Sequence, residues 1–369
     1  MAYPQLEGNM CSAVLDISTV PVDPDEYVRE LMRWHFRPET GSPYWLRRAS
    51  TLGFDPIADV RTFDDLRRFP NVIDEFRDVA IEDLIPRGLD GADRVIAGIF
   101  ESGGTTGLPK RFVMFDRWME FALGWDEFHY AELGTLNTLA IAPSGPHMFG
   151  EFAARRARRH HGVKFTVDLD PRWIKSLIAR GDTEQADRYA EHLIDQAAHI
   201  LTTQSVGILI TTPPLLERLA RRPELVEAVR AQVRFICWSG AHMDADSRDI
   251  FRQEIFPGIP VKGLYGSTTI LGMSRERPEE HPDGLPVFDA PSPYIVFRVV
   301  RPGTDTDVEF GERGQVVMNH LTKYALLPNN PERDMATKVR ALPGALGCAV
   351  ADVGPVATFG DRAVIEGVY

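Results

Sequence analysis

Short apolar runs recur along the middle of the chain and alternate with segments of helical spacing. Five of these runs have the length and composition typical of buried strands, at residues 137–142, 163–168, 206–210, 233–238 and 260–264. Amphipathic segments typical of helices lie between them, near residues 150–161, 183–203, 214–222 and 244–256. Strands that alternate with helices at this spacing predict an α/β fold with a parallel, doubly wound sheet.

The two ends of the chain show other patterns. Tyr27, Leu31 and Trp34 recur at one-face helical spacing in the first part, which predicts helices that pack on the core. Strand-like runs separated by glycine-containing turns predict a small β-rich subdomain near the end. The expected organisation is a helical lead-in at 1–95, an α/β subdomain at 96–205, a doubly wound α/β subdomain at 206–289 and the β-rich subdomain at 290–369.

A segment rich in glycine and hydroxyl side chains lies between two apolar runs, at residues 101–111. Its glycines allow successive backbone N–H groups to turn inward around an anion, its hydroxyls donate hydrogen bonds, and its lysine adds a positive charge. The residues concerned are Ser102, Gly103, Gly104, Thr105, Thr106, Gly107 and Lys110. The spacing fits neither a Walker loop nor a dinucleotide fingerprint. The segment is therefore a candidate polyphosphate loop between two strands, and a hairpin turn without a ligand is the alternative.

Polar residues follow three of the expected parallel strands. They form the stretches 211–212, 239–242 and 265–269, and a Pro/Gly/Ser-rich loop that contains His147 follows an earlier strand. Ligands bind at the carboxyl ends of the strands in open α/β sheets. We therefore expect these segments to converge on one rim and form the second half of a site.

Composition limits the partners and the compartment. The 369 residues carry a net charge of -12, which argues against nucleic acid or an anionic membrane as a partner. The three cysteines, Cys11, Cys237 and Cys348, are far apart and fit neither a disulfide framework nor a zinc site. No signal-like or membrane-spanning apolar stretch is present in the sequence. We expect a cytoplasmic protein, with a homodimer as one possible assembly.

Several motifs together resemble those of the adenylate-forming superfamily, which includes acyl-CoA synthetases, luciferases and peptide-synthetase adenylation domains. Residues 102–110 resemble its phosphate loop, residues 239–242 its adenine-lining segment, and Tyr265-Gly266-Ser267-Thr268-Thr269 its Tyr-Gly-x-Thr-Glu motif. Residues 321–323, followed by Asp334, resemble the phenylacetate–CoA ligase branch. The resemblance implies the large N-terminal part of the adenylate-forming fold, with the mobile C-terminal domain absent.

The resemblance also implies a role for each matching residue. ATP would be bound by Ser102, Gly103, Gly104, Thr105, Thr106, Gly107, Lys110, Gly240, Ala241, His242, Tyr265, Gly266, Ser267, Thr268 and Asp334. Lys110, Thr268 and His147 would contact the reacting groups, with His147 beside the acyl substrate. Thr269 stands where the family has its magnesium-binding glutamate, so no metal ligand is assigned. We expect Mg²⁺ to arrive with ATP or to be held by another carboxylate.

The activity that the resemblance implies is adenylation of a carboxylic acid, limited to the first half-reaction. The similarity is greatest to adenylating proteins of phenazine antibiotic biosynthesis, which implies an aromatic, phenazine-carboxylate-like acid and transfer of the acyl-AMP to a partner reductase or acyltransferase. An aromatic cluster could line a flat substrate pocket or belong to the core, and comprises Trp118, Phe121, Trp125, Phe128 and Phe149. The competing hypothesis is a non-catalytic protein that binds a nucleotide or an aromatic acid.

Overall fold

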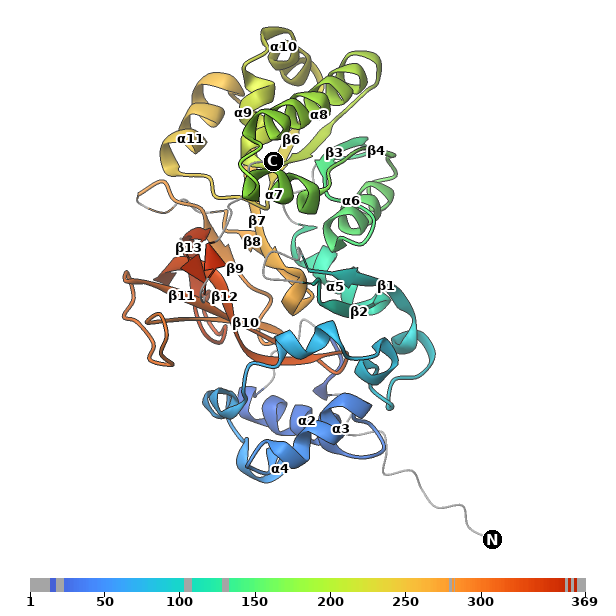
Figure 1. Ribbon diagram of the computed structural model, residues 1–369, viewed down its shortest axis with the longest axis vertical. Helices are drawn as coiled ribbons and strands as arrows, with labels where there is room; N and C mark the ends of the chain where they lie inside the picture. Colours follow the sequence, from blue (N-terminus) through green and yellow to red (C-terminus); the bar gives the residue numbers. More distant parts are fainter. Residues whose placement is uncertain are drawn as a thin grey trace.

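A computed structural model describes residues 14–17, 23–102, 108–127, 133–278, 281 and 283–355, with the backbone at 358–359 and 362–363. The lead-in helices α2–α4 lie at one end of an elongated molecule, helices α8–α11 lie at the other, and the sheets lie between them (Figure 1). The helices are α2 (Pro24–Phe36), α3 (Pro43–Arg48), α4 (Pro56–Asp59), α5 (Asp116–Trp125), α6 (Met148–Arg159), α7 (Pro171–Ala179), α8 (Thr183–Thr203), α9 (Pro213–Ala220), α10 (Pro223–Gln232) and α11 (Ala245–Asp249), which continues as a π-helix (Ile250–Ile255).

Most of the strands belong to one mixed sheet. In that sheet the order of the 11 strands is β10-β11-β12-β13-β9-β8-β7-β6-β5-β3-β4. The strands of the structure are β1 (Ile96–Glu101), β2 (Arg111–Phe115), β3 (Thr138–Ala142), β4 (Lys164–Asp168), β5 (Ile208–Thr211), β6 (Phe235–Trp238), β7 (Val261–Ser267), β8 (Gly272–Glu276), β9 (Val287–Asp289), β10 (Ile295–Val300), β11 (Arg313–Leu321), β12 (Leu326–Val339), β13 (Ala349–Pro355), β14 (Thr358–Phe359) and β15 (Arg362–Ala363).

The sheet changes from parallel to antiparallel at β7. Strands β4, β3, β5, β6 and β7 pair in parallel, as the alternation of strands and helices predicted. From β7 through β8, β9, β13, β12 and β11 to β10 every pairing is antiparallel. Strands from the three segments expected after residue 95 therefore share one sheet, and the α/β fold class is confirmed.

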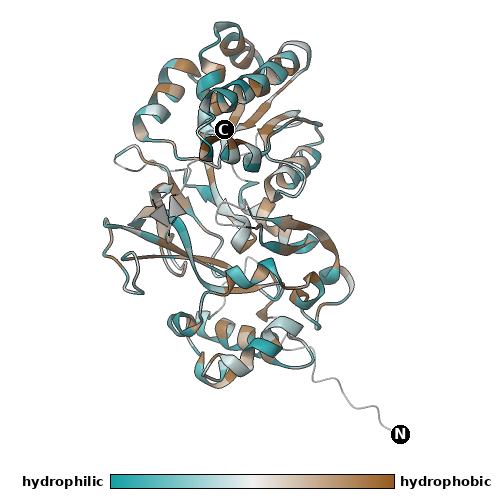
Figure 2. Cartoon of the chain, viewed as in Figure 1, coloured by the Kyte–Doolittle hydropathy of each residue, from teal (hydrophilic) through white to brown (hydrophobic). Residues whose placement is uncertain are grey.

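Burial explains why the inner parallel strands β3, β5 and β6 are almost entirely apolar. Every residue of β3, β5 and β6 is buried, and helices α6 and α8 pack beside β3 and β4. Figure 2 shows hydrophobic residues along the inner strands and hydrophilic residues on the outer helices. Cys237 and Cys348 are buried and form no disulfide. No helix in the described part of the chain has the length and apolarity needed to cross a membrane.

The candidate phosphate loop joins two antiparallel strands, as the flanking apolar runs predicted. β1 and β2 form a separate hairpin in which Glu101 pairs with Arg111. Just beyond that pair, Ser102 N donates to Lys110 O at 3.0 Å, and Lys110 N donates to Ser102 Oγ at 3.0 Å. These two bonds close the base of the loop, so Ser102 and Lys110 lie opposite each other.

The lead-in is fixed to the turn between β11 and β12. The side chains of Tyr27 and Trp34 in α2 donate to Leu321 O and Lys323 O at 2.6 and 2.8 Å. Asp23 begins the helix, since its Oδ1 accepts hydrogen bonds from two backbone N–H groups at 2.9 Å each. The segment 321–323, which supported the resemblance to one ligase branch, thus anchors the N-terminal helices.

Helix α7 is one of the elements that the sequence analysis missed, as are α10, β8 and β9. Asp170 caps its first turn by accepting hydrogen bonds from Arg172 N and Trp173 N at 2.9 and 3.1 Å, and Pro171 occupies its first position. Its own residues Ile174 and Leu177 are buried. The next helix, α8, has the predicted bounds. Its buried face consists of Ala186, Ala190, Leu193, Ile194, Ala197 and Leu201.

Candidate functional site

Two adjoining cavities lie at the carboxyl ends of the parallel strands. The first has a volume of about 200 Å³ and the second about 260 Å³. Predicted site residues line the first cavity, namely Gly240, Ala241, His242, Tyr265, Gly266, Ser267 and Asp334. Predicted residues of the second are His147, Gly240, Gly266, Ser267 and Thr268. The strand ends therefore converge on one rim, as expected.

Tyr265 and Asp334 are joined across the first cavity. The Tyr265 hydroxyl, from β7, donates to Asp334 Oδ2, from β12, at 2.9 Å. The Tyr265 ring packs near Phe288 and Phe297 at centroid distances of 5.9 and 5.8 Å. Burial and the Asp334 charge raise the pKa of Tyr265 well above its ordinary value, so the phenol keeps the proton that it donates. The first cavity is therefore lined by the Tyr265 ring and, hydrogen-bonded to it, the Asp334 carboxylate.

The turn after β6 forms another part of the wall of the first cavity. Gly240 has φ +85°, a conformation that glycine adopts without strain. On one side of it, Ser239 Oγ donates to Leu264 O at 2.8 Å and thereby fixes the turn to β7. On the other side, His242 Nε2 lies 3.0 Å from Asp352 Oδ1 in β13. The turn is thus held from both the parallel and the antiparallel parts of the sheet.

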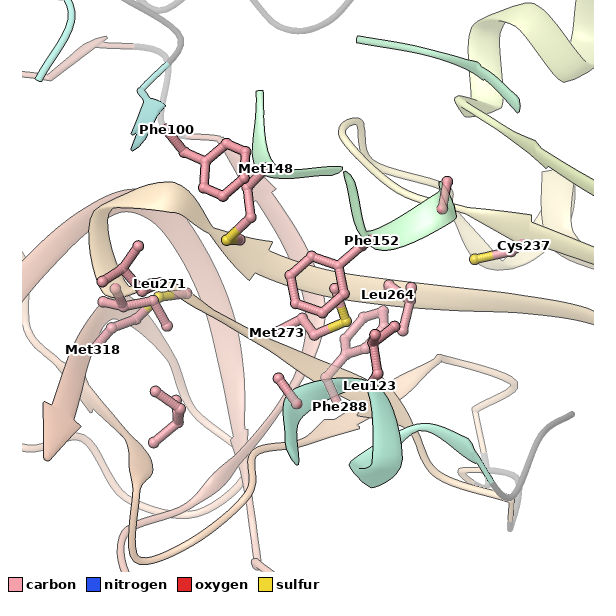
Figure 3. Packing of buried hydrophobic residues seen from close by; sticks show 14 of the residues in the cluster. Phe100, Leu123, Met148, Phe152, Cys237, Leu264, Leu271, Met273, Phe288 and Met318 are labelled. Carbon is pink, nitrogen blue, oxygen red and sulfur yellow. The ribbon is translucent and has the colours of Figure 1, made fainter. Parts of the chain in front are cut away.

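Apolar side chains form much of the second cavity. Met148, Phe149 and Met273 line it together with His147. Figure 3 shows Met148 beside Phe100 of β1, so this wall continues into the packed core. Burial, followed by the positive charge of Arg172, lowers the pKa of His147 below its ordinary value, which favours the neutral imidazole at pH 7.

The loop that carries His147 is tied to the strands on both sides. Ser144 donates from its N and Oγ to Asp168 Oδ1, at the end of β4, at 3.1 and 2.6 Å. Glu101 N, at the end of β1, donates to Pro146 O at 2.8 Å. These bonds place the base of the candidate phosphate loop beside the second cavity.

The structure describes only part of the candidate phosphate loop. Residues 103–107 (Gly103, Gly104, Thr105, Thr106 and Gly107) lie outside the described residues. Ser102 and Lys110 flank them, and neither belongs to the lining of the two cavities. Lys110 Nζ lies 2.8 Å from Asp74 Oδ1, in the short 3₁₀ helix Ile73–Arg77 of the lead-in. The expected phosphate-binding cation therefore has a carboxylate partner in this conformation.

Glu332 is a site residue that the sequence analysis missed. It lines the first cavity and accepts a hydrogen bond from the hydroxyl of Thr269, the residue that replaces the glutamate of the resembled motif. Asn330 Nδ2 also donates to Glu332 Oε1 at 2.8 Å. Burial, and then the charge of Asp334, raises the pKa of Glu332 above its ordinary value. A carboxylate thus stands beside Thr269, supplied by β12.

The predicted aromatic cluster divides among three places. Phe149 lines the second cavity. Trp118 belongs to the core, where its Nε1 donates to Leu271 O at 2.7 Å and its ring stacks on Phe121 at 5.4 Å. Phe121 and Trp125 line a different cavity of about 680 Å³. Phe128 lies outside the described residues. Of the four cluster members that the structure describes, only Phe149 lines the candidate site.

The fold is that of the large N-terminal part of the acyl-CoA ligases. Over 93% of this chain and 69% of the other, it is similar to 2-hydroxyisobutyryl-CoA ligase in complex with 2-HIB-AMP and CoA, with a TM-score of 0.64 and 15% identity. ATP-bound MatB from Rhodopseudomonas palustris is similar over 72% of this chain and 49% of the other, with a TM-score of 0.50 and 19% identity. No protein-family model matches the sequence, and a search of curated proteins finds no match.

Proposed function

We propose that this protein uses ATP to adenylate a carboxylic acid. The observation that carries the proposal is the pair of adjoining cavities at the strand ends, one bordered by the Tyr265–Asp334 pair and the other by apolar residues and His147. The first offers an aromatic ring and a carboxylate to a nucleoside, and the second offers apolar walls to an organic acid. The two adjoin, so an acid in one would meet the phosphates of a nucleotide in the other.

The residues of the first cavity fit a nucleoside. Trp238 lines this cavity with its indole, a flat apolar surface suited to an aromatic base, and its buried Nε1 has no hydrogen-bond partner among the described residues. Asp334 can accept hydrogen bonds from ribose hydroxyls in place of the one from Tyr265. In the second cavity, Thr268 adds a hydroxyl donor, next in sequence to Ser267, which lines both cavities.

The reaction that this arrangement suits is attack of a carboxylate oxygen on the α-phosphorus of ATP. One oxygen–phosphorus bond forms, the bond to the β-phosphate oxygen breaks, and pyrophosphate leaves. A carboxylic acid is already ionised at neutral pH, so no general base is needed. Catalysis then consists of positioning the two reactants and neutralising their negative charges.

Magnesium fits the site through Glu332. Among the described residues there is no group of three or more His, Cys, Asp or Glu side chains suited to a metal. Mg²⁺ bound with nucleotide phosphates usually needs only one or two carboxylates, and Glu332 is the carboxylate beside Thr269. When bound, the ion would offset the charge of the phosphates. We propose Glu332 as its protein ligand.

The substrate that we propose is an aromatic acid of the phenazine-carboxylate type. Its support is the apolar lining of the second cavity, including Phe149 and two methionines, together with the resemblance described above. The product would be an acyl adenylate formed in the first half-reaction. A partner reductase or acyltransferase in the cytoplasm would then consume it, in a pathway such as phenazine antibiotic biosynthesis.

The proposal is tested by detecting the acyl adenylate directly. The protein is incubated with ATP, Mg²⁺ and a panel of aromatic acids that includes a phenazine carboxylic acid, and acyl-AMP is identified by mass spectrometry. We expect one or more acids to give acyl-AMP, and Asp334→Ala to reduce its formation strongly. Asp246→Ala, which removes an exposed aspartate from α11, is the matched control and should leave the yield unchanged. If ATP is consumed or bound but no acid gives acyl-AMP, the proposal is wrong.

A non-catalytic nucleotide- or acid-binding protein is the second candidate function. Two observations favour it, the threonine at position 269 and the ion pair between Lys110 and Asp74. Under this hypothesis the protein binds ATP or an aromatic acid with a measurable dissociation constant but forms no acyl-AMP with any acid in the panel. Calorimetry combined with the mass-spectrometric assay separates the two functions.

A further inference from the structure

Two positively charged residues stand where the two cavities meet. The cavities share part of their lining, and in the described part of the chain the charged residues in that shared part are Lys175 and Arg333. Lys175 comes from α7 and Arg333 from β12, so the charges approach from different elements. If one cavity holds the nucleoside and the other the acid, this junction faces the α-phosphate and the carboxylate.

The position of Lys175 is fixed by the start of α7. Pro171 and Lys175, four residues apart, lie on one face of the helix, and both line the second cavity. Between them, Arg172 Nη2 donates to Glu101 Oε2 at 2.7 Å and to Ser102 O at 3.3 Å. Helix α7 is thereby attached to the base of the candidate phosphate loop, and its residue Lys175 lines both cavities.

The surroundings of Lys175 favour an anionic ligand. The side chain is half-buried, and burial followed by the nearby charge of Arg333 lowers its pKa from 10.5 to about 8. Two cations that approach one partly desolvated junction repel each other, and an anion placed between them removes that repulsion. The carboxylates of the first cavity, Glu332 and Asp334, adjoin Arg333 in sequence but belong to the nucleoside side alone.

We propose that Lys175 binds the α-phosphate of the nucleotide and, together with Arg333, neutralises the charge that builds up as the acid carboxylate approaches it. This inference rests on the proposed adenylation, because it assigns the α-phosphate to the junction of the two cavities. Lys175 would then be a substrate-binding residue of the site, although α7 lies outside the motifs identified in the sequence.

The test compares AMP with adenosine, which differ only in the α-phosphate. Binding of each ligand is measured by calorimetry at pH 7 for the wild type, Lys175→Met and Lys175→Arg. Loss of one charged hydrogen bond to phosphate should weaken AMP binding by roughly ten- to a hundredfold in Lys175→Met. The adenosine dissociation constant should stay within about twofold of the wild-type value, because adenosine has no phosphate for Lys175 to bind. Lys175→Arg keeps the charge and should recover most of the AMP affinity.

Lys164→Met is the matched control. Lys164 lies on β4, is partly buried, and donates through its Nζ to Gly150 O at 3.1 Å, but it does not line either cavity. The Lys164→Met variant should bind AMP with the wild-type affinity. Equal AMP affinity in Lys175→Met and the wild type would overturn the inference and leave the proposed function standing. Equal weakening of AMP and adenosine in Lys175→Met would also overturn it, because it would show a structural effect on the cavity. A wild type that binds neither ligand would overturn both proposals.

Discussion

Lys110 Nζ and Asp74 Oδ1 lie 2.8 Å apart, so the lysine expected to bind phosphate is paired with the lead-in. Asp74 also lies 2.8 Å from Arg77 Nη1, and Arg77 Nε donates to Leu108 O at 3.1 Å. Burial opposes ionisation of Asp74, but the hydrogen bond and charge of Lys110, with the charge of Arg77, outweigh it and lower its pKa. A nucleotide that binds through Lys110 therefore has to compete with Asp74.

Releasing Lys110 should strengthen nucleotide binding. The Asp74 side chain is 74% exposed, and exposed ion pairs are worth at most about 1 kcal/mol, so Asp74→Asn should tighten ATP binding by about two- to fivefold. Calorimetry at low ionic strength measures the change. Asp64→Asn removes an equally exposed acid of the lead-in, which pairs with Arg67, and should leave ATP affinity unchanged. Weaker ATP binding in Asp74→Asn would mean that Asp74 orients Lys110 productively.

Removing the Lys110 charge should have the opposite effect. Hydrogen bonds from charged groups are worth about 1.5–3 kcal/mol, so Lys110→Ala should weaken ATP binding by roughly ten- to a hundredfold. AMP, which lacks the β- and γ-phosphates, should bind Lys110→Ala and the wild type almost equally. An unchanged ATP dissociation constant would remove residues 102–110 from the nucleotide site.

Glu332→Gln should increase stability and weaken the effect of magnesium. The folded protein raises the pKa of Glu332, so its contribution to stability is fully present below the unfolded pKa and is lost as the pH rises through the folded value. At pH 7 glutamine removes the cost of the buried charge, and the melting temperature should exceed that of the wild type. The gain in ATP affinity on adding Mg²⁺ should fall about tenfold, the scale of one lost charged contact. An unchanged Mg²⁺ effect would place the metal away from Glu332.

The charge of Lys175 should reduce stability at neutral pH. Its pKa falls from 10.5 to about 8 on folding, which corresponds to a cost of up to about 3 kcal/mol below pH 8. Lys175→Met should therefore raise the free energy of unfolding at pH 7. Between pH 8 and 10.5 the unfolded wild type binds more protons, so its stability rises with pH and the advantage of methionine shrinks. Denaturant titrations at pH 7 and pH 10 measure the free energies of unfolding of the wild type and the variant. A lower stability of Lys175→Met than of the wild type at pH 7 would contradict this reasoning.

The parallel half of the fold and the rim of the site could be predicted from the sequence. Strands β3, β5 and β6 are short, almost entirely apolar runs bounded by turn residues, and most of the helices between the parallel strands have clear periodicity. Because parallel strands end at one edge, the residues after β5, β6 and β7 had to converge there. The positions of Gly240 and Tyr265 at one cavity follow directly from that topology.

The residues that were missed depend on signals of other kinds. Strand β12 contains Pro328 and Pro331 and a left-handed Asn329, so its sequence does not have the alternation of a strand, and the direction of Glu332 is set by irregular pairing with β11. Helix α7 did carry a readable signal, an aspartate cap before Pro171 with apolar residues at helical spacing. The pairing of Lys110 with Asp74 joins distant parts of the chain, and no local pattern encodes it.

Exchange of radiolabelled pyrophosphate into ATP tests the central claim most directly, because it reports the first half-reaction without any acyl acceptor. The wild type is assayed with Mg²⁺ and each acid of the aromatic panel, beside Asp334→Ala and the control Asp246→Ala. We expect exchange that requires an added acid, persists in Asp246→Ala and is largely lost in Asp334→Ala. Tight ATP binding without acid-dependent exchange for any member of the panel would contradict adenylation and favour the binding-protein hypothesis.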